Sequence, residues 1–120
     1  MLQRASGNVS KADVTNVRFI ESPATKITIQ DATADCIVSN CVINLVPAEE
    51  KQLAFNEMYR VLKPGGRVAI SDILARKKLP EDMTKSIALQ VGCIAGASQV
   101  SQYETYLGNA GFKGMLPLST

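Results

Sequence analysis

The stretch ADCIVSNCVINLVPAEEKQLAFNEMYRVLKPGGRVAISDI, residues 34–73, carries the signals that decide the fold. It opens on a continuous apolar run at 34–40, which predicts a strand covered on both faces of a parallel sheet. A helix pattern follows, and a second buried strand is predicted at 67–73. Strand, helix and strand in this order form one βαβ unit, so the sequence predicts an α/β fold with a parallel sheet.

The helix between the two strands has signals at both ends. Pro47 fits the first helical position, and Glu49 and Glu50 lie in the first turn, where the helix dipole favours acids. Apolar side chains at helical spacing predict one buried face, formed by Phe55, Met58, Tyr59 and Leu62. The segment LKPGG at 62–66 predicts the end of the helix and a reversal into the next strand.

Weaker patterns precede this unit. The segment NVRFIES at 16–22 has the β-branched and aromatic content of a short strand, which Pro23 would end. Residues 1–15 are expected either to be poorly ordered or to form a remnant helix. No linker or internal repeat divides the chain, so we predict one domain over residues 1–120.

The last third predicts two further helices. Pro80 followed by two acids predicts a helix within 79–91, and small residues interrupt it at 92–97. A second helix is predicted at 98–112, with three boundary signals: a cap at Ser98, a capping box from Ser101 to Glu104, and a stop at Gly111. The remaining residues fit either a poor strand or a tail.

Composition excludes several classes of protein. The chain has 120 residues, of which 46% are hydrophobic and 20% charged, as in one globular domain. Its 13 basic and 11 acidic residues are interleaved, which argues against nucleic-acid or membrane-surface binding. The start lacks the apolar core of a secretory signal, and the longest apolar run, 36–48, is too short to span a bilayer. We therefore expect a cytoplasmic protein with free thiols.

Polar residues follow both predicted strands. Because parallel α/β sheets bind ligands beyond the carboxyl ends of their strands, these positions form a candidate rim: Ser39, Asn40, Cys41, Ser71 and Asp72. The alternative is that such residues are common at strand ends because their side chains bond to local backbone. Position alone leaves both interpretations open.

The three cysteines differ in context. Cys36 lies inside the strand run and is predicted to be a small core residue. Cys41 lies just beyond the strand, and Cys93 lies in a glycine-flanked break, so two thiols converging on one rim would suit a soft, thiophilic ligand. A closed zinc site is not favoured, because the chain has no histidine and no fourth cysteine. The lack of histidine also excludes Ser-His-Asp and Cys-His catalysis.

Several motifs together resemble the second half of a class I S-adenosylmethionine-dependent methyltransferase. They are FIESPA at 19–24, DATADCIVSNCVINLVP at 31–47 and MYRVLKPGGRVAISDI at 58–73. More narrowly, SNCVINLVP at 39–47 and VGCIAGA at 91–97 resemble the arsenite methyltransferases, and the resemblance covers about 16–113. It implies a Rossmann-like class I methyltransferase fold that is incomplete, without the first two strands and the glycine-rich cofactor loop.

The resemblance also implies a site. The family's motif cysteines bind trivalent arsenic, free or as a thiol conjugate, and the matching positions are Cys41 and Cys93. Thiolate coordination leaves the arsenic lone pair free to attack the methyl group of S-adenosylmethionine. Contacts to this cofactor are implied at the strand end and at the backbone before it, namely Ser39, Asn40, Cys41, Ala24 and Thr25. No separate catalytic residue and no metal ligand are implied.

The sequence departs from the family in two respects. No cysteine precedes Cys36, although family members carry a further arsenic-binding cysteine upstream, and no glycine-rich loop precedes a helix. We therefore expect weak or no methyl transfer by this chain alone, and an open sheet edge through which it could self-associate. Two alternatives remain open: a non-catalytic module that captures arsenite or a partner, and a methyltransferase for another small molecule.

Overall fold

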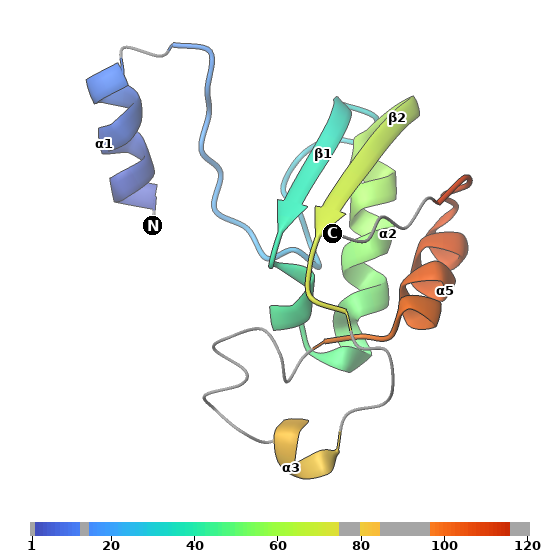
Figure 1. The fold of residues 1–120 in the computed structure, drawn as a ribbon. Helices are drawn as coiled ribbons and strands as arrows, with labels where there is room; N and C mark the ends of the chain where they lie inside the picture. Colours follow the sequence, from blue (N-terminus) through green and yellow to red (C-terminus); the bar gives the residue numbers. More distant parts are fainter. Residues whose placement is uncertain (1, 13–14, 75–79, 85–96, 116–120) are drawn as a thin grey trace.

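The computed structural model describes residues 2–12, 15–74, 80–84 and 97–115. Two parallel strands lie side by side, helix α2 covers one face of them, and helix α5 packs along α2 (Figure 1). Helix α1, Leu2–Ala12, lies away from the sheet (Figure 1). The predicted α/β fold with a strand, helix, strand unit is confirmed.

The first strand, β1, spans Ala34–Asn40 as predicted, and it pairs in parallel with β2, Leu62–Ser71. Strand β2 begins earlier than the predicted 67–73 and ends two residues sooner. The LKPGG segment is therefore not a free turn. It is an irregular stretch inside β2, where the register shifts between the partners of Ala34 and Cys36.

Two glycines make this irregularity feasible. Gly65 has φ of +83°, a left-handed conformation that glycine adopts without strain. A Cβ at Gly66 would lie 2.9 Å from the carbonyl oxygen of Lys63 and 3.0 Å from that of Asp35, so only glycine lets the strands approach this closely. The helix does end before this segment, as predicted.

Only one face of the sheet is covered in the described part of the chain. Ile37, Val68 and Ile70 pack against the core, whereas Val38 is 79% exposed on the other face. The prediction of burial on both faces is therefore wrong. The prediction that Cys36 is a core residue is also wrong. Cys36 lies two residues before Val38 on β1, so it faces the same uncovered side of the sheet, and it is exposed.

Helix α2 spans Lys51–Val61 and follows a 3₁₀ turn at Ala48–Glu50. Pro47 occupies the position before that turn, and Glu49 and Glu50 lie within the turn, ahead of the α-helix proper. Of the predicted apolar face, Phe55 and Met58 are buried in α2, whereas Leu62 is buried as the first residue of β2. Tyr59 is instead half-exposed, and its ring meets Phe112 edge to face at 5.1 Å.

Helix α5 spans Val100–Ala110 and ends at Gly111 as predicted, in a left-handed conformation with φ of +114°. Its cap is not Ser98, and the capping box is not Ser101 with Glu104. Gln99 caps the helix, and its backbone N–H donates to Oε1 of Gln102 at 2.7 Å. Ser98 lies one residue before this cap position, and its hydroxyl accepts a hydrogen bond from Lys51.

The core forms where α2 and α5 meet the sheet. Its buried members are Ile43, Ala54, Phe55, Met58, Tyr103 and Leu107. The ring of Phe55 packs edge to face on Tyr103 at 5.4 Å and stacks on Tyr106 at 5.5 Å. These contacts fix α5 against α2, and so place Tyr103 near the ends of the strands.

The predicted strand at 16–22 is wrong, because residues 15–22 are irregular. A strand requires backbone partners, and no described segment pairs with this one. Of the predicted helix at 79–91, the described part is α3, Glu81–Thr84. The rest of that helix, the 92–96 part of the break and residues 116–120 lie outside the described residues, and residues 113–115 form no strand.

Candidate functional site

The two strands end together, and the polar residues that follow them share one rim. The register pairs Ser39 with Ile70 and Asn40 with Ser71. The backbone N–H of Cys41 then donates to the carbonyl of Ser71 at 2.9 Å. All the residues of the predicted rim thus lie at one end of the sheet. They are Ser39, Asn40, Cys41, Ser71 and Asp72.

Cys41 has an unusual backbone conformation. Its φ is +56°, in the left-handed region, and its side chain is half-buried. This conformation costs a residue other than glycine about 1–2 kcal/mol. Such residues persist only where the surrounding structure holds them, and they cluster at functional sites. Cys41 is the one residue of this rim with a left-handed backbone.

The loop after Cys41 is tied to the residues after β2. The Asn44 side chain is buried, and its Nδ2 donates to the carbonyl of Ile73 at 2.7 Å. The Tyr103 hydroxyl donates to Oδ2 of Asp72 at 2.8 Å and lies 3.4 Å from Oδ1 of Asn44. Burial, together with the bond to Asp72, raises the pKa of Tyr103 above its ordinary value. The Tyr103 hydroxyl therefore stays protonated and acts as a hydrogen-bond donor to Asp72 at the rim.

A buried lysine lies under the same rim. Only 3% of Lys51 is exposed, and its Nζ donates to the hydroxyl of Ser98 at 2.7 Å. Burial lowers the pKa of Lys51, and the Asp72 carboxylate opposes that shift. Lys51 thus ties the start of α2 to Ser98, two residues before α5 begins, in the neighbourhood of Asp72.

Two polar atoms of the rim are buried without a hydrogen-bond partner. They are Oγ of Ser39 and Oδ1 of Asp72. A buried polar atom left unpaired costs roughly 1–3 kcal/mol, so each such atom in a folded protein calls for an explanation. Both atoms lie where a ligand of a parallel α/β sheet is expected.

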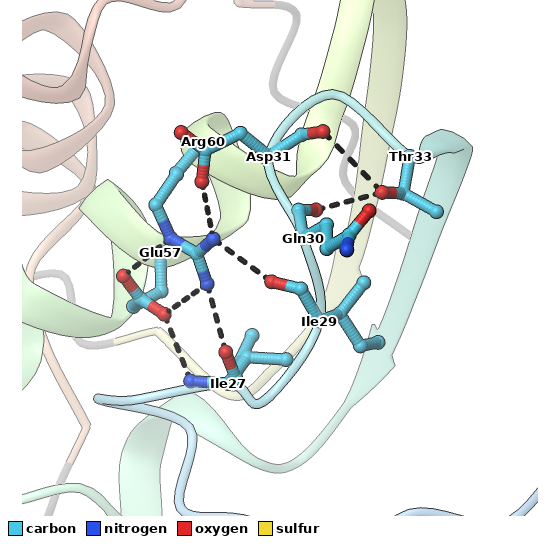
Figure 2. Close-up of polar contacts among 7 residues, drawn as sticks. All are labelled: Ile27, Ile29, Gln30, Asp31, Thr33, Glu57 and Arg60. Carbon is cyan, nitrogen blue, oxygen red and sulfur yellow. Dashed lines mark hydrogen bonds and ion pairs between the residues drawn. The ribbon is translucent and has the colours of Figure 1, made fainter.

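A separate polar cluster lies along α2 (Figure 2). The Arg60 guanidinium donates to the carbonyls of Ile27 and Ile29, each at 2.8 Å, and to the carboxylates of Glu57 and Asp31. Glu57 also accepts the backbone N–H of Ile27 at 2.8 Å. These bonds hold the segment before β1 against the helix.

The Arg60 guanidinium has no N–H left for a ligand. A guanidinium has five N–H groups, and those of Arg60 make five hydrogen bonds. The cleft beside it measures about 400 Å³ and is lined by Lys26, Ile27, Thr28, Ile29, Gln30, Glu57 and Arg60. Because the Arg60 guanidinium is fully bonded to the chain itself, we interpret the Arg60 cluster as a structural clamp and keep the rim as the candidate site.

Within the described residues, no group of three or more His, Cys, Asp and Glu side chains is placed to hold a metal ion. None of the helices described is both long and apolar enough to cross a membrane.

Residues 1–111 match the protein family described as a methyltransferase domain. The chain belongs to the methyltransferase-domain family. This methyltransferase domain is 41% identical to the arsenite methyltransferase of Halobacterium salinarum over 115 residues, which cover 96% of the chain and 29% of that protein. It is 42% identical to mouse arsenite methyltransferase over 85 residues, or 68% of the chain and 22% of the mouse protein. It therefore spans less than a third of the length of these curated relatives.

Solved structures share the fold of this methyltransferase domain. An arsenic(III) S-adenosylmethionine methyltransferase from Chlamydomonas reinhardtii superposes with a TM-score of 0.79 at 29% identity, covering 92% of this chain and 39% of that one. The YcgJ protein of Bacillus subtilis superposes with a TM-score of 0.76 at 20% identity, and this likeness concerns the fold alone. The predicted class I methyltransferase fold, present here in part, is confirmed.

The remaining predicted site residues of the methyltransferase domain lie in two places. Ala24 and Thr25 form a turn in which the backbone N–H of Lys26 donates to the carbonyl of Pro23 at 3.1 Å, and Ala24 packs against the core. Cys93 lies outside the described residues. Roles in binding remain predictions for all of these positions.

Sequence reasoning missed three residues that this methyltransferase domain places at its rim: Asn44, Lys51 and Tyr103. Asn44 lies in the run 36–48 after the first strand, and Lys51 and Tyr103 lie in the two helices predicted around them. A signal was available for Tyr103, since a buried tyrosine needs a partner for its hydroxyl. Lysine at a core position likewise requires a partner, but the sequence does not identify it.

Proposed function

We propose that this chain takes part in the S-adenosylmethionine-dependent methylation of trivalent arsenic, with Cys41 and Cys93 as the arsenic ligands. The observation that carries the proposal is the position of Cys41, a half-buried thiol in a constrained conformation at the carboxyl end of the sheet. Identity to arsenite methyltransferases from an archaeon and a mammal supports arsenic as the substrate.

The chemistry of the donors agrees with this substrate. Thiolates are soft ligands and suit a soft centre such as trivalent arsenic. Two thiolates would hold the arsenic while its lone pair stays free. The contribution of the protein is then to fix the arsenic relative to the methyl donor, an effect of proximity and orientation that can supply about 7–11 kcal/mol.

The rim offers polar groups that fit part of S-adenosylmethionine. The Ser39 hydroxyl oxygen is buried without a partner, and Asn40 is exposed at the very end of β1. Backbone groups of the turn at Ala24 and Thr25 are the other proposed contacts. When bound, this cofactor supplies an electrophilic methyl group on a sulfonium. The Ser39 hydroxyl and the Asn40 amide would orient it by hydrogen bonding.

Isothermal titration of arsenite into the chain tests the proposal. We expect saturable binding that is lost or weakened at least tenfold in Cys41→Ser and in Cys93→Ser. Cys36→Ser is the matched control, because Cys36 is an exposed thiol on the uncovered face and should not contribute. Binding of equal strength in all three variants would refute the assignment of the two thiols.

A second candidate is methyl transfer to another small molecule. The chain is 35% identical over 71 residues to a ubiquinone/menaquinone biosynthesis C-methyltransferase from Citrobacter koseri, with 59% of the chain covered. Titration separates the two candidates, since this one predicts binding of S-adenosylmethionine without binding of arsenite. Arsenite binding without any binding of S-adenosylmethionine, in contrast, would identify a non-catalytic thiol module.

A further inference from the structure

The conformation of Cys41 needs support from its surroundings. With φ of +56°, its backbone turns sharply at the end of β1. The turn directs the chain into the short 3₁₀ segment Ile43–Leu45. An extended residue at this position would continue the strand instead and move the thiol away from its present place at the rim.

Two hydrogen bonds fasten the chain on both sides of this turn. At its start, the backbone N–H of Cys41 donates to the carbonyl of Ser71. Three residues later, Nδ2 of Asn44 donates to the carbonyl of Ile73. The segment from Cys41 to Asn44 is therefore attached at both ends to the residues around the end of β2.

Tyr103 of helix α5 contacts the residues that follow β2, to which the Cys41 segment is attached. Its hydroxyl has one proton, and the shorter distance, 2.8 Å to Asp72 against 3.4 Å to Asn44, assigns that proton to Asp72. Asp72 lies between Ser71 and Ile73, which are the two acceptors that hold the Cys41 segment. Tyr103 therefore fixes the strand end to which that segment is attached.

We propose that Asn44 and Tyr103 are positioning residues that hold Cys41 in its left-handed conformation and so set where its thiol meets the methyl acceptor. This inference rests on the proposed function for its ligand, a trivalent arsenic species. Asn44 and Tyr103 are each 4% exposed, so water does not compete for the hydrogen bonds of their side chains. Both side chains donate hydrogen bonds to residues that follow β2: Asn44 donates to Ile73, and Tyr103 donates to Asp72.

Three variants test the inference. Asn44→Leu removes the donor to Ile73 while retaining bulk. Tyr103→Phe removes the hydroxyl but retains the ring that packs on Phe55. Tyr106→Phe is the matched control, because it makes the same change on the neighbouring ring of α5, which stacks on Phe55 and has no assigned role at the rim.

Two readouts are used with each variant. Arsenite affinity is measured by titration, and the alkylation rate of Cys41 by N-ethylmaleimide is measured relative to that of exposed Cys36 by mass spectrometry. In Asn44→Leu and Tyr103→Phe, we expect arsenite affinity to fall about tenfold while the relative alkylation rate of Cys41 rises at least threefold. The released thiol becomes easier to reach but is less well placed.

The outcomes separate this inference from the function on which it rests. Unchanged alkylation and unchanged affinity in both variants would overturn the positioning role, as would equal changes in Tyr106→Phe. If the unmodified chain binds no arsenite, the proposed function fails, and the alkylation ratio alone decides whether Asn44 and Tyr103 hold Cys41. Should Asn44→Leu fail to fold, Tyr103→Phe decides by the same criteria.

Discussion

The carboxylate of Glu57 and the guanidinium of Arg60 form a two-point pair on one turn of α2: Oε2 lies 2.8 Å from Nη2 and Oε1 lies 2.9 Å from Nε. The pair also holds the backbone of Ile27 from both sides, through its N–H and its carbonyl. The segment that leads into β1 is thereby fixed to the helix that leads into β2 (Figure 2). Since the rim depends on both strands, this clamp supports the site from the opposite end of the sheet.

Removing the clamp should lower the melting temperature. Arg60→Met leaves the carbonyls of Ile27 and Ile29 without their donor, so we expect a clear fall in circular-dichroism melts. Lys63→Met is the matched control, because the Lys63–Asp35 pair is a single contact at 3.5 Å between mostly exposed side chains. Equal melting temperatures for the two variants would contradict the clamp.

The same pair predicts how stability depends on acid. The hydrogen bond from Arg60 lowers the pKa of Glu57 below its ordinary value of 4.5. A carboxylate with a depressed pKa stabilises the fold above that ordinary value, and this contribution is lost as the pH falls through the lowered pKa. The difference in melting temperature between the native chain and Glu57→Gln should therefore be largest above pH 4.5 and shrink below it. A difference that stays constant from neutral pH to pH 3 would be inconsistent with the pairing.

Replacing either of two glycines, one inside α5 and one just after it, with alanine should change the free energy of unfolding in opposite directions. Gly108 lies in the helix with open space around it, so Gly108→Ala should raise the free energy of unfolding by up to about 1 kcal/mol. Gly111 is left-handed, and a Cβ there would lie 2.8 Å from Cζ of Tyr59, so Gly111→Ala should lower it by about 1–2 kcal/mol. Denaturant titration measures both, and a stabilising Gly111→Ala would refute the assigned helix end.

The strain at Cys41 can be measured directly. Cys41→Gly and Cys41→Ala both remove the thiol, but only glycine adopts φ of +56° without steric cost. We expect Cys41→Gly to unfold at a free energy about 0.5–1 kcal/mol higher than Cys41→Ala, even after the larger backbone entropy of glycine is included. If the alanine variant is the more stable of the two, Cys41 is not held in a left-handed conformation in solution.

The βαβ unit could be predicted because its signals are local. Apolar runs, the acids after Pro47 and the glycine at 111 depend on neighbours in the sequence. The strand at 16–22 could not be judged in this way, since a strand forms only where a distant segment supplies hydrogen bonds. The exposure of Cys36 has the same origin: a continuous apolar run does not report which of its faces the rest of the chain covers.

The candidate site was predictable in position but not in its supports. Strand order and strand ends placed Cys41 at the rim. The partners of Asn44 and Tyr103 lie 29 and 31 residues away in the sequence, and no local pattern connects them. For Ser98, a local pattern gave a wrong prediction. Serine is a preferred residue at helix caps, but here the Ser98 hydroxyl accepts a hydrogen bond from the distant, buried Lys51.

The most direct test of the account is the number of sulfur atoms around bound arsenic, measured by X-ray absorption at the arsenic edge on the arsenite-loaded chain. Two sulfur neighbours are expected in the unmodified chain and in Cys36→Ser, and no more than one in Cys41→Ser. An unchanged sulfur count in Cys41→Ser would contradict the claim that the rim thiol binds arsenic.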